Sequence, residues 1–246
     1  MKAMENIRTT EDLKTIEYYD NESKIYSSKR YPTLVNTFVQ YLFKKRLEIA
    51  LDMVAPYEYD SVLELGCADG ILLRQLVSRF PGKLSRLVGV DISPLMIKQA
   101  RIMTPADMSI EYQMVSETPK EKFNLIMAIG FMNVQLWQNE ISYLLGHLRA
   151  DGYLLISFAN LHSLHSMMKN EETSSSVLRA TPSTYRKMLK VDFDIIAYKP
   201  YGFFVPKLWA LPGFARFFQV FVDYLLAHIL PSLFHEHLYL LRSRKH

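Results

Sequence analysis

Two acidic residues near glycines are the best candidates in the sequence for binding a small organic ligand. Glu64 belongs to the apolar, strand-like run 62–65, and Gly66 and Gly70 follow it before a helical run begins at Ile71. Glycines let a backbone approach a ligand closely, and the start of the next helix presents free N–H groups. Because a buried carboxylate is costly unless it is paired, we expect Glu64 to face a ligand or hydrogen-bond donors.

A second acid narrows the class of ligand. Asp91 closes the apolar run 87–90 and lies 21 residues after Gly70. A carboxylate at the end of a second strand can accept hydrogen bonds from both hydroxyls of a ribose. The glycine spacing differs from G-x-G-x-x-G, and the lysine of a phosphate-binding loop is absent. The spacing therefore indicates a ribose-bearing ligand without a phosphate clamp.

Apolar runs alternate with helical patterns along the chain. Strands are expected at 62–65, 87–91, 108–115, 123–129, 153–158, 193–198 and 237–241, and helices at 34–54, 71–79, 95–103, 140–148, 182–189 and 214–230. We expect Pro32 to open the first of these helices, and Ser93 and Thr181 to cap later ones. This alternation predicts a doubly wound α/β sheet, which binds ligands at the carboxyl ends of its strands.

Composition sets the broad class of the protein. The 246 residues are 49% hydrophobic, which suits a single domain with an ample core. The net charge of +4 is too small to argue for nucleic acid, although it is compatible with an anionic ligand or a membrane surface. Cys67 is the single cysteine, so an internal disulfide is excluded and a reducing compartment is favoured. Residues 1–20 contain no apolar signal-peptide core.

The N-terminal residues are polar and rich in tyrosine. Tyr18, Tyr19, Tyr26 and Tyr31 fall within residues 1–32. Two interpretations stay open: a surface arm, or a flap that lays tyrosines such as Tyr26 over a ligand.

The glycine turn and the second acid resemble the class I S-adenosylmethionine-dependent methyltransferases. Their first motif is (D/E)-x-G-x-G-x-G, followed by an acid at the end of the second strand; Glu64, Gly66, Gly70 and Asp91 match it. Residues 123–126 and 148–156 are also similar to that family. The resemblance implies a Rossmann-like, mostly parallel seven-stranded sheet with an antiparallel last strand. It also implies one domain over 1–246, with a helical cap 1–55 and an apolar helical insertion 201–234.

The resemblance also implies roles for individual residues around S-adenosylmethionine. Residues 66–68 would pass beside the methionine part, and Glu64 would orient its amino group through backbone or water. Asp91 would hold the ribose, and Ile92 would pack on the adenine. The full set implied for the cofactor is Glu64, Gly66, Cys67, Ala68, Gly70, Asp91, Ile92, Ser116 and Ile129, with Glu117 as the alternative to Ser116 and no metal.

Two residues depart from the family pattern. Ala68 replaces the middle glycine, which is tolerable if its φ stays negative. Asn124 replaces the usual aspartate of the fourth strand, which we expect to affect a structural contact more than catalysis.

Methyl transfer from a sulfonium is an in-line displacement in which positioning supplies much of the catalysis. A hydroxyl nucleophile gains from a general base such as histidine. His162 is our candidate base, and Asn160-Leu161-His162 resembles a segment of methyltransferases from polysaccharide and lipid-linked sugar pathways. A solvent-exposed histidine at a helix start is the alternative for His162.

Residues 201–234 are rich in apolar side chains and include Phe203 and Trp209, two candidate substrate contacts together with Tyr26 and Asn160. Three interpretations stay open: a lid over an apolar substrate, an interfacial helix docked on a membrane, or a dimer interface. Charges inside the segment and prolines around it argue against a transmembrane span.

The sequence therefore predicts an S-adenosylmethionine-dependent methyltransferase that O-methylates a small, apolar or lipid-linked acceptor. We expect it in the cytoplasm, with peripheral membrane contact through residues 203–234 at the inner face of the membrane, and no nucleic-acid partner. Two alternatives are a nucleic-acid methyltransferase and a non-catalytic cofactor-binding scaffold. The Asn-Pro-Pro-Tyr type motif of amino-group DNA methyltransferases is absent after residue 129, which weighs against the first.

Overall fold

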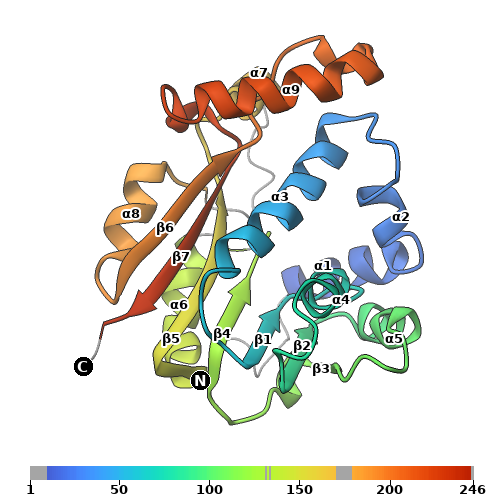
Figure 1. Ribbon diagram of the computed structural model, residues 1–246, viewed down its shortest axis with the longest axis vertical. Helices are drawn as coiled ribbons and strands as arrows, with labels where there is room; N and C mark the ends of the chain where they lie inside the picture. The colour runs from blue at the N-terminus through green and yellow to red at the C-terminus, as the bar shows by residue number, and fades with distance from the viewer. Residues whose placement is uncertain (1–9, 131, 133, 170–178, 245–246) are drawn as a thin grey trace.

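A twisted seven-stranded sheet forms the centre of the computed structural model, which describes residues 10–130, 132, 134–169 and 179–244 (Figure 1). The strand order is β3-β2-β1-β4-β5-β7-β6, and only β7 runs antiparallel to its neighbours. This confirms the predicted doubly wound, mostly parallel sheet with an antiparallel last strand. The strands are β1 (Ser61–Leu65), β2 (Arg86–Asp91), β3 (Glu111–Met114), β4 (Phe123–Ala128), β5 (Leu148–Ala159), β6 (Phe193–Tyr201) and β7 (Glu236–Ser243).

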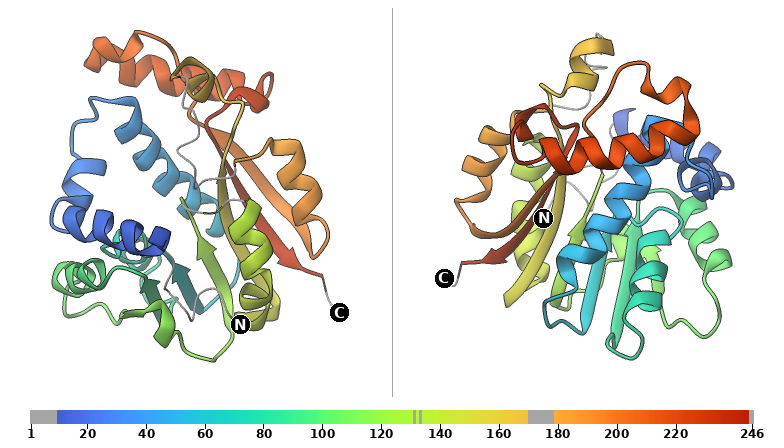
Figure 2. Two further views of the ribbon diagram at one scale, coloured as in Figure 1. Left: turned by 180° about the vertical axis from the view of Figure 1, so that it is seen from behind. Right: turned by 45° about the horizontal axis from the view of Figure 1, so that its top comes forward.

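Helices cover both faces of the sheet, as Figure 2 shows from two further directions. Helices α3, α4 and α5 bury their apolar side chains in one core, and α6 and α8 pack into the other. The helices are α1 (Thr10–Glu22), α2 (Tyr26–Arg30), α3 (Phe38–Val54), α4 (Ile71–Arg79), α5 (Pro94–Met103), α6 (Val134–His147), α7 (Leu164–Lys169), α8 (Pro182–Leu189) and α9 (Pro212–Leu226), with short 3-10 turns η1 (Val115–Glu117), η2 (Leu208–Ala210) and η3 (Pro231–Leu233).

Capping residues set several helix boundaries. The Ser93 and Thr181 side chains accept hydrogen bonds from the first turns of α5 and α8, as predicted. The start expected near Pro32 for the helix over 34–54 is wrong. Thr37 Oγ1 accepts from Gln40 N at 3.2 Å, so α3 begins at Phe38 and Pro32 lies in the loop before it.

The antiparallel direction of β7 determines where the insertion, residues 201–234, begins and ends. Strand β6 ends at Tyr201 and β7 begins at Glu236, and these two residues are paired across the sheet. The chain between them therefore leaves and re-enters at the edge where the parallel strands end. Helix α9 lies across that edge (Figure 1). Within the part of the chain that the structure describes, no helix has both the length and the apolar character to cross a bilayer.

Candidate active site

The glycine turn after β1 is a backbone cradle at the carboxyl edge of the sheet. Gly66 N and Cys67 N both donate to Val90 O, at 2.8 and 3.0 Å, which ties the turn to β2. Gly66 and Gly70 have φ values of +69° and +79°, in the left-handed region that glycine tolerates. Gly70 also caps α4, so the cradle leads directly into the helix N-terminus.

Ala68 departs from the expectation of a negative φ. Its φ is +48°, so the alanine adopts the left-handed conformation that the family's glycine would adopt. That conformation costs a non-glycine residue roughly 1–2 kcal/mol. Ala68 N donates to Asp91 Oδ2 at 2.9 Å, which helps to hold the strained residue in place.

Asp91 sits at the end of β2 and is 8% exposed. Besides the bond from Ala68 N, its Oδ1 accepts from Ser93 N at 2.9 Å. A carboxylate offers about four acceptor sites, so Asp91 retains capacity for hydroxyl donors. Ile92, next in the chain, is partly buried against the core on the α6 side. Asp91 therefore links the cradle to the start of α5 and keeps acceptor capacity at the strand end.

Glu64 lies in β1, and its Oε2 is buried without a hydrogen-bond partner among the described residues. Burial raises the pKa of Glu64 well above its usual range, and the charges of Asp91 and Asp69 raise it further. Burial also raises the pKa of Asp91, although backbone N–H groups of Ser93 and Ala68 oppose that rise. The cradle thus places an unpartnered carboxylate oxygen of Glu64 near Asp91, whose carboxylate retains acceptor capacity. An ammonium, a sulfonium and ribose hydroxyls are the groups that S-adenosylmethionine would bring, so these residues fit it.

A cavity of about 40 Å³ lies beside Glu64. Pockets that bind small molecules measure roughly 300–1,000 Å³, so in this conformation the cavity is too small to hold such a ligand. The sheet side contributes Glu64, Gly66, Cys67, Ala68 and Ile129, and helices and the N-terminal arm contribute Tyr26, Tyr31, Arg46, Leu47, Ala50, Ile71 and Leu72.

Residues 10–31 form an N-terminal arm that covers the cradle. Ser27 Oγ donates to the Asp69 carboxylate, and Asp20 accepts from Ser93 Oγ and from Leu95 N. Tyr26 lines the cavity from this arm. The arm therefore packs against the cradle, and a flap that lays its tyrosines over a ligand stays a prediction.

A buried ion pair outside the sequence motifs forms part of the same wall. Arg46 Nη2 donates to Glu236 Oε2 at 2.7 Å, and Arg46 Nε donates to Tyr201 Oη at 3.1 Å. Burial alone would raise the pKa of Glu236, but the Arg46 charge and hydrogen bonds from its neighbours hold that pKa below its usual range. Ser157 Oγ connects Glu236 to Gly130 N, at 2.7 and 2.8 Å.

Sequence reasoning missed this pair, although a signal for Arg46 exists. Arg46 lies four residues after Leu42 and four before Ala50, so it falls inside the apolar stripe of the helix. A charge in a buried stripe indicates a buried partner. Nothing local to Glu236 identifies that partner, because 190 positions separate the two residues.

Of the predicted substrate contacts, Tyr26 lines the cavity, whereas Asn160, Phe203 and Trp209 are not part of its lining. Asn160 is fully buried, and its Nδ2 donates to Ser232 O and Phe234 O, at 2.6 and 2.9 Å. These bonds give Asn160 a structural role in joining β5 to the segment before β7. Phe203 packs on Phe234, and Trp209 packs on Tyr41 with ring centroids 5.6 Å apart.

His162 and Ser116 are exposed and do not line the cavity. His162 N donates to Asn160 Oδ1, so the backbone rather than the imidazole makes its hydrogen bond here. His165 and His235 lie close together, with ring centroids 5.0 Å apart, and His165 is 6% exposed. Burial lowers the pKa of His235 to about 4. Asn124, the other departure from the family pattern, accepts from Ser61 Oγ at 2.7 Å in a structural contact between β4 and β1.

Among the residues that the structure describes, no group of three or more histidine, cysteine, aspartate or glutamate side chains is arranged to hold a metal ion.

Residues 62–152 match the model of a methyltransferase domain family. A trans-aconitate 2-methyltransferase of Enterobacter sp. is 34% identical over 107 residues, which cover 42% of this chain and 40% of that protein. A trans-aconitate 2-methyltransferase of Azoarcus sp. is 29% identical over 152 residues, which cover 59% of this chain and 55% of that protein. The chain thus spans about half or less of these curated relatives' lengths.

Solved structures extend the similarity of the fold over nearly the whole chain. The magnesium protoporphyrin IX methyltransferase of Synechocystis, crystallised with bound S-adenosylmethionine, superposes with a TM-score of 0.62 at 13% identity and covers 97% of this chain and 100% of that one. At this identity the likeness concerns the fold alone. It includes the arrangement of the sheet that positions the cradle.

Proposed function

We propose that the protein transfers a methyl group from S-adenosylmethionine to a small acceptor, since residues 62–152 match a methyltransferase domain model. The observation that carries this proposal is the cradle itself. Glu64, with an unpartnered buried carboxylate oxygen, and Asp91 lie beside the left-handed turn 66–70. This arrangement supports a ligand that is cationic and rich in hydroxyl donors.

The residues of the cradle would bind and orient the cofactor. Bound S-adenosylmethionine supplies an electrophilic methyl group on a positively charged sulfur. Asp91 would accept hydrogen bonds from the ribose, and Glu64 would offset positive charge on the methionine part. Because burial raises the pKa values of both carboxyls, and the charge of Asp91 raises the pKa of Glu64 further, a cationic ligand would stabilise their ionised forms. Binding would thus be coupled to proton release from the cradle.

The N-terminal arm would exclude water from the transfer. With Tyr26 and Tyr31 over the cradle, the cavity of about 40 Å³ cannot admit a nucleoside, so the arm must open for entry and close afterwards. Closure would bring acceptor and cofactor together, and this positioning is the main contribution a protein makes to a displacement of this kind.

The acceptor we propose is an apolar or lipid-linked molecule that is methylated on oxygen. The apolar insertion at the carboxyl edge, which includes Phe203 and Trp209, supports it. We further propose that the protein works in the cytoplasm at the inner face of a membrane, where such an acceptor would be reached. The curated relatives are named for trans-aconitate, so this small acid is the direct comparison.

Isothermal titration calorimetry with S-adenosylmethionine tests the cofactor. We expect the wild type to bind and Asp91→Ala to bind at least about tenfold more weakly, because a hydrogen bond to a charged group contributes about 1.5–3 kcal/mol. Asp107→Ala, which changes an exposed acid in a turn, is the matched control and should bind as the wild type does. Equal binding by the Asp91→Ala and control variants would refute the assignment. Asp91→Asn serves the same purpose if the alanine variant does not fold.

Formation of S-adenosylhomocysteine tests turnover and the acceptor class. The purified protein is incubated with labelled cofactor and, separately, with lipid extracts, trans-aconitate and nucleic acid, and methylated products are identified by mass spectrometry. We expect product from the lipid extract, and less of it with His162→Gln if His162 is the base. Cofactor binding without any product would favour the scaffold alternative.

A further inference from the structure

Helix α9 turns Gln219 and Asp223 toward the protein and a row of apolar side chains toward solvent. Gln219 is fully buried and Asp223 is 6% exposed, whereas Phe217 and Tyr224 are 79% and 76% exposed. An amphipathic helix on a globular domain ordinarily has the opposite orientation. The outward direction of the apolar side therefore needs a reason.

Buried hydrogen bonds fix this orientation. The Asp223 carboxylate accepts from Gly202 N, Phe203 N and Tyr41 Oη, at 3.0, 2.9 and 2.8 Å. Gln219 Nε2 donates to Phe203 O at 2.6 Å. Rotating the helix to bury its phenylalanines would break these bonds and leave the polar groups unpaired, which is strongly unfavourable. The inverted orientation is therefore built into the fold.

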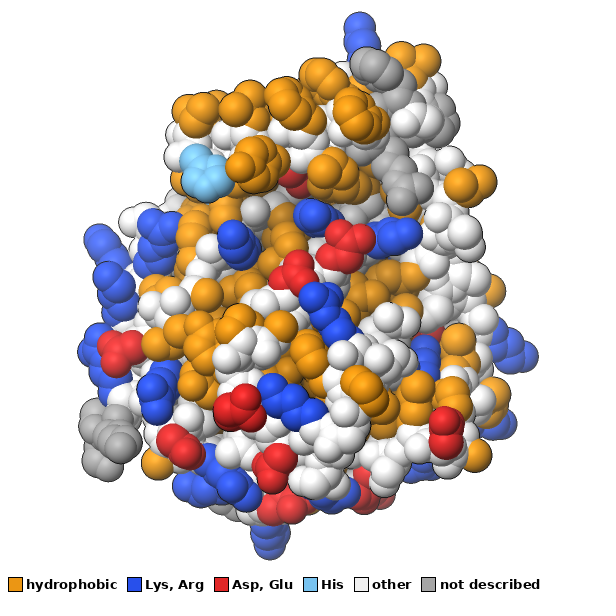
Figure 3. Space-filling model, in the orientation of Figure 1, with side chains coloured by type: hydrophobic (Ala, Val, Ile, Leu, Met, Phe, Trp, Pro, Cys, Tyr) orange, Lys and Arg blue, Asp and Glu red, His pale blue; other side chains and the backbone are white. Residues whose placement is uncertain are grey.

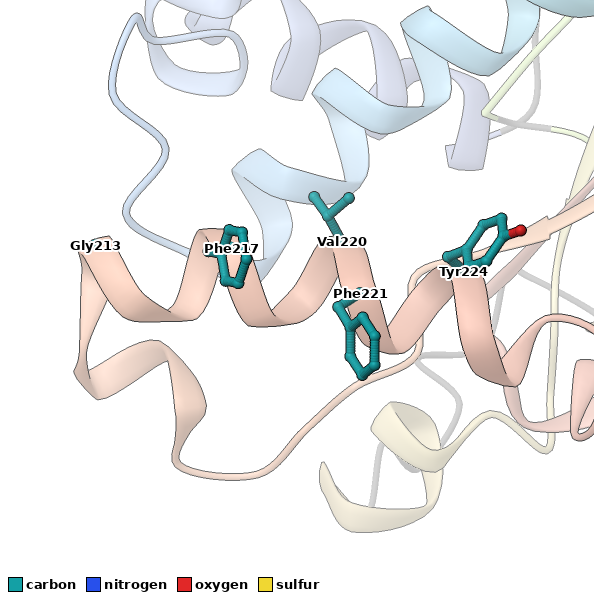
Figure 4. A pocket seen from close by; sticks show the side chains of 5 residues that line it. All are labelled: Gly213, Phe217, Val220, Phe221 and Tyr224. Carbon is teal, nitrogen blue, oxygen red and sulfur yellow. The ribbon is translucent and has the colours of Figure 1, made fainter.

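The outward side forms one continuous apolar surface, which we call the α9 face: Phe217, Val220, Phe221, Tyr224 and Leu225. All five are at least 48% exposed. The space-filling view shows an orange row along the top of the molecule over α9 (Figure 3). Four of the five, with Gly213, line an open groove along the helix (Figure 4). Exposed apolar patches of this kind mark interaction sites.

The chemistry of the α9 face favours a lipid surface. The face contains no acidic side chain, since the single acid of α9 is the buried Asp223. Lys207 is exposed just before the helix, and the chain carries a net charge of +4, which complements anionic headgroups. Phenylalanine on the apolar side of a helix that is too short to span a bilayer is typical of interfacial segments.

We propose that the α9 face docks the protein on an anionic lipid bilayer. Helix α9 lies parallel to the membrane plane and inserts Phe217, Phe221 and Tyr224 among the headgroups. Because α9 crosses the carboxyl edge of the sheet, docking turns the edge that carries the cradle toward the lipid surface (Figure 1). The interaction does not depend on methyl transfer.

Flotation of the purified full-length protein with vesicles tests the proposal. The vesicles contain phosphatidylcholine alone or with phosphatidylglycerol. We expect the wild type to float with the anionic vesicles. Phe217→Ser/Phe221→Ser should partition at least about tenfold less, because it loses two aromatic rings that would be buried in the lipid headgroup layer. Ile102→Ser/Val191→Ser removes two side chains of 66% and 69% exposure on other elements and should float as the wild type does.

Three results would overturn the proposal. The wild type could stay at the bottom of the gradient with anionic vesicles. The α9 double variant could float as well as the control variant. Sedimentation equilibrium without lipid could show a wild-type dimer that the α9 double variant converts to monomer, which would assign the face to a second copy. Circular dichroism of both double variants confirms that a loss of flotation is not a loss of folding.

Discussion

Gly70 illustrates how tightly a single position is constrained at the cradle. Its φ of +79° lies in the left-handed region, and a Cβ there would lie 2.3 Å from Tyr112 Oη. Tyr112 is itself buried and hydrogen-bonded to Thr104 Oγ1 at 3.0 Å, so it cannot easily move away. Both the backbone angle and the packing therefore demand glycine.

Gly82 separates these two effects. It has a φ of +74° but nothing within 4 Å of an added Cβ. We expect Gly82→Ala to destabilise the protein by about 1 kcal/mol, from backbone strain alone. Gly70→Ala should cost about 2–4 kcal/mol, because overpacking adds about 1–3 kcal/mol. Urea unfolding of the two variants measures the difference. Equal losses would show that the space beside Gly70 adjusts without cost.

The residues that sequence reasoning identified are those whose signals are local. Glu64, Gly66, Gly70 and Asp91 fall in one short motif and the end of the next strand, so spacing alone predicts that they come together. The Arg46–Glu236 pair forms only when α3 packs across the sheet onto β7. The positive φ of Ala68 could not be predicted from the sequence either, because alanine favours a negative φ and the surrounding turn imposes a positive one.

At the scale of elements, the N-terminal arm is attached weakly enough to open. Ser27 Oγ donates to the Asp69 carboxylate, and Ser93 Oγ and Leu95 N donate to the Asp20 carboxylate. Each neutral hydrogen bond contributes about 1 kcal/mol, and those to charged groups somewhat more. The arm can therefore open while the sheet stays folded.

We expect Asp20→Ala/Ser27→Ala to raise amide hydrogen exchange in residues 10–31 by about tenfold or more, as the loss of two or three such bonds implies. Exchange in α3 should not change, because α3 is held by the apolar core. Mass spectrometry of peptic peptides measures both regions. Asp107→Ala/Asp194→Ala, which removes two exposed acids outside both regions, is the control. Equal exchange in the arms of the two double variants would show that other contacts hold the arm closed.

Elements with strong capping or strand patterns were predictable, and the arm was not. Ser93-Pro94 and Thr181-Pro182 give local start signals that the structure obeys. Helix α1 has few apolar residues, and α2 is only five residues long, so neither shows a clear periodic pattern. Their placement depends on contacts with α5 and α3, which no local window of sequence contains.

At the scale of the whole molecule, strand β7 lies between β5 and β6, and two histidines, His235 and His237, flank Glu236 at its start. Glu236 and His237 open β7, and His235 precedes it. Burial lowers the pKa values of His235 and His237 to about 4. Arg186 and His235 also lower the pKa of His237, whereas the carbonyl of Phe234 and the charge of Glu236 oppose them. A histidine that is neutral in the folded state makes stability depend on pH.

The sign follows from proton uptake. Unfolded histidine protonates near pH 6.5, whereas folded His237 does so only near pH 4, so the unfolded state binds more protons between these values. Stability from this group is complete above pH 6.5 and is lost as the pH falls toward 4. The carboxyls of Glu64 and Asp91, whose pKa values burial raises, act in the opposite direction in acid. The contribution of His237 to the pH dependence of stability is therefore isolated by comparing the wild type with a variant at this position.

His237→Gln removes the titrating group and leaves an amide that can accept the hydrogen bond that Tyr198 Oη shares with His237 Nδ1 at 2.7 Å. The variant should be less stable than the wild type at pH 7.5, and the gap should shrink by about 2 kcal/mol between pH 6.5 and 5, at 1.36 kcal/mol per pH unit. Urea unfolding across this range measures the gap. His228→Gln, at an exposed histidine of the chain after α9, should keep the wild-type pH dependence. A gap for His237→Gln that stays constant with pH would show that His237 does not titrate differently in the folded and unfolded states.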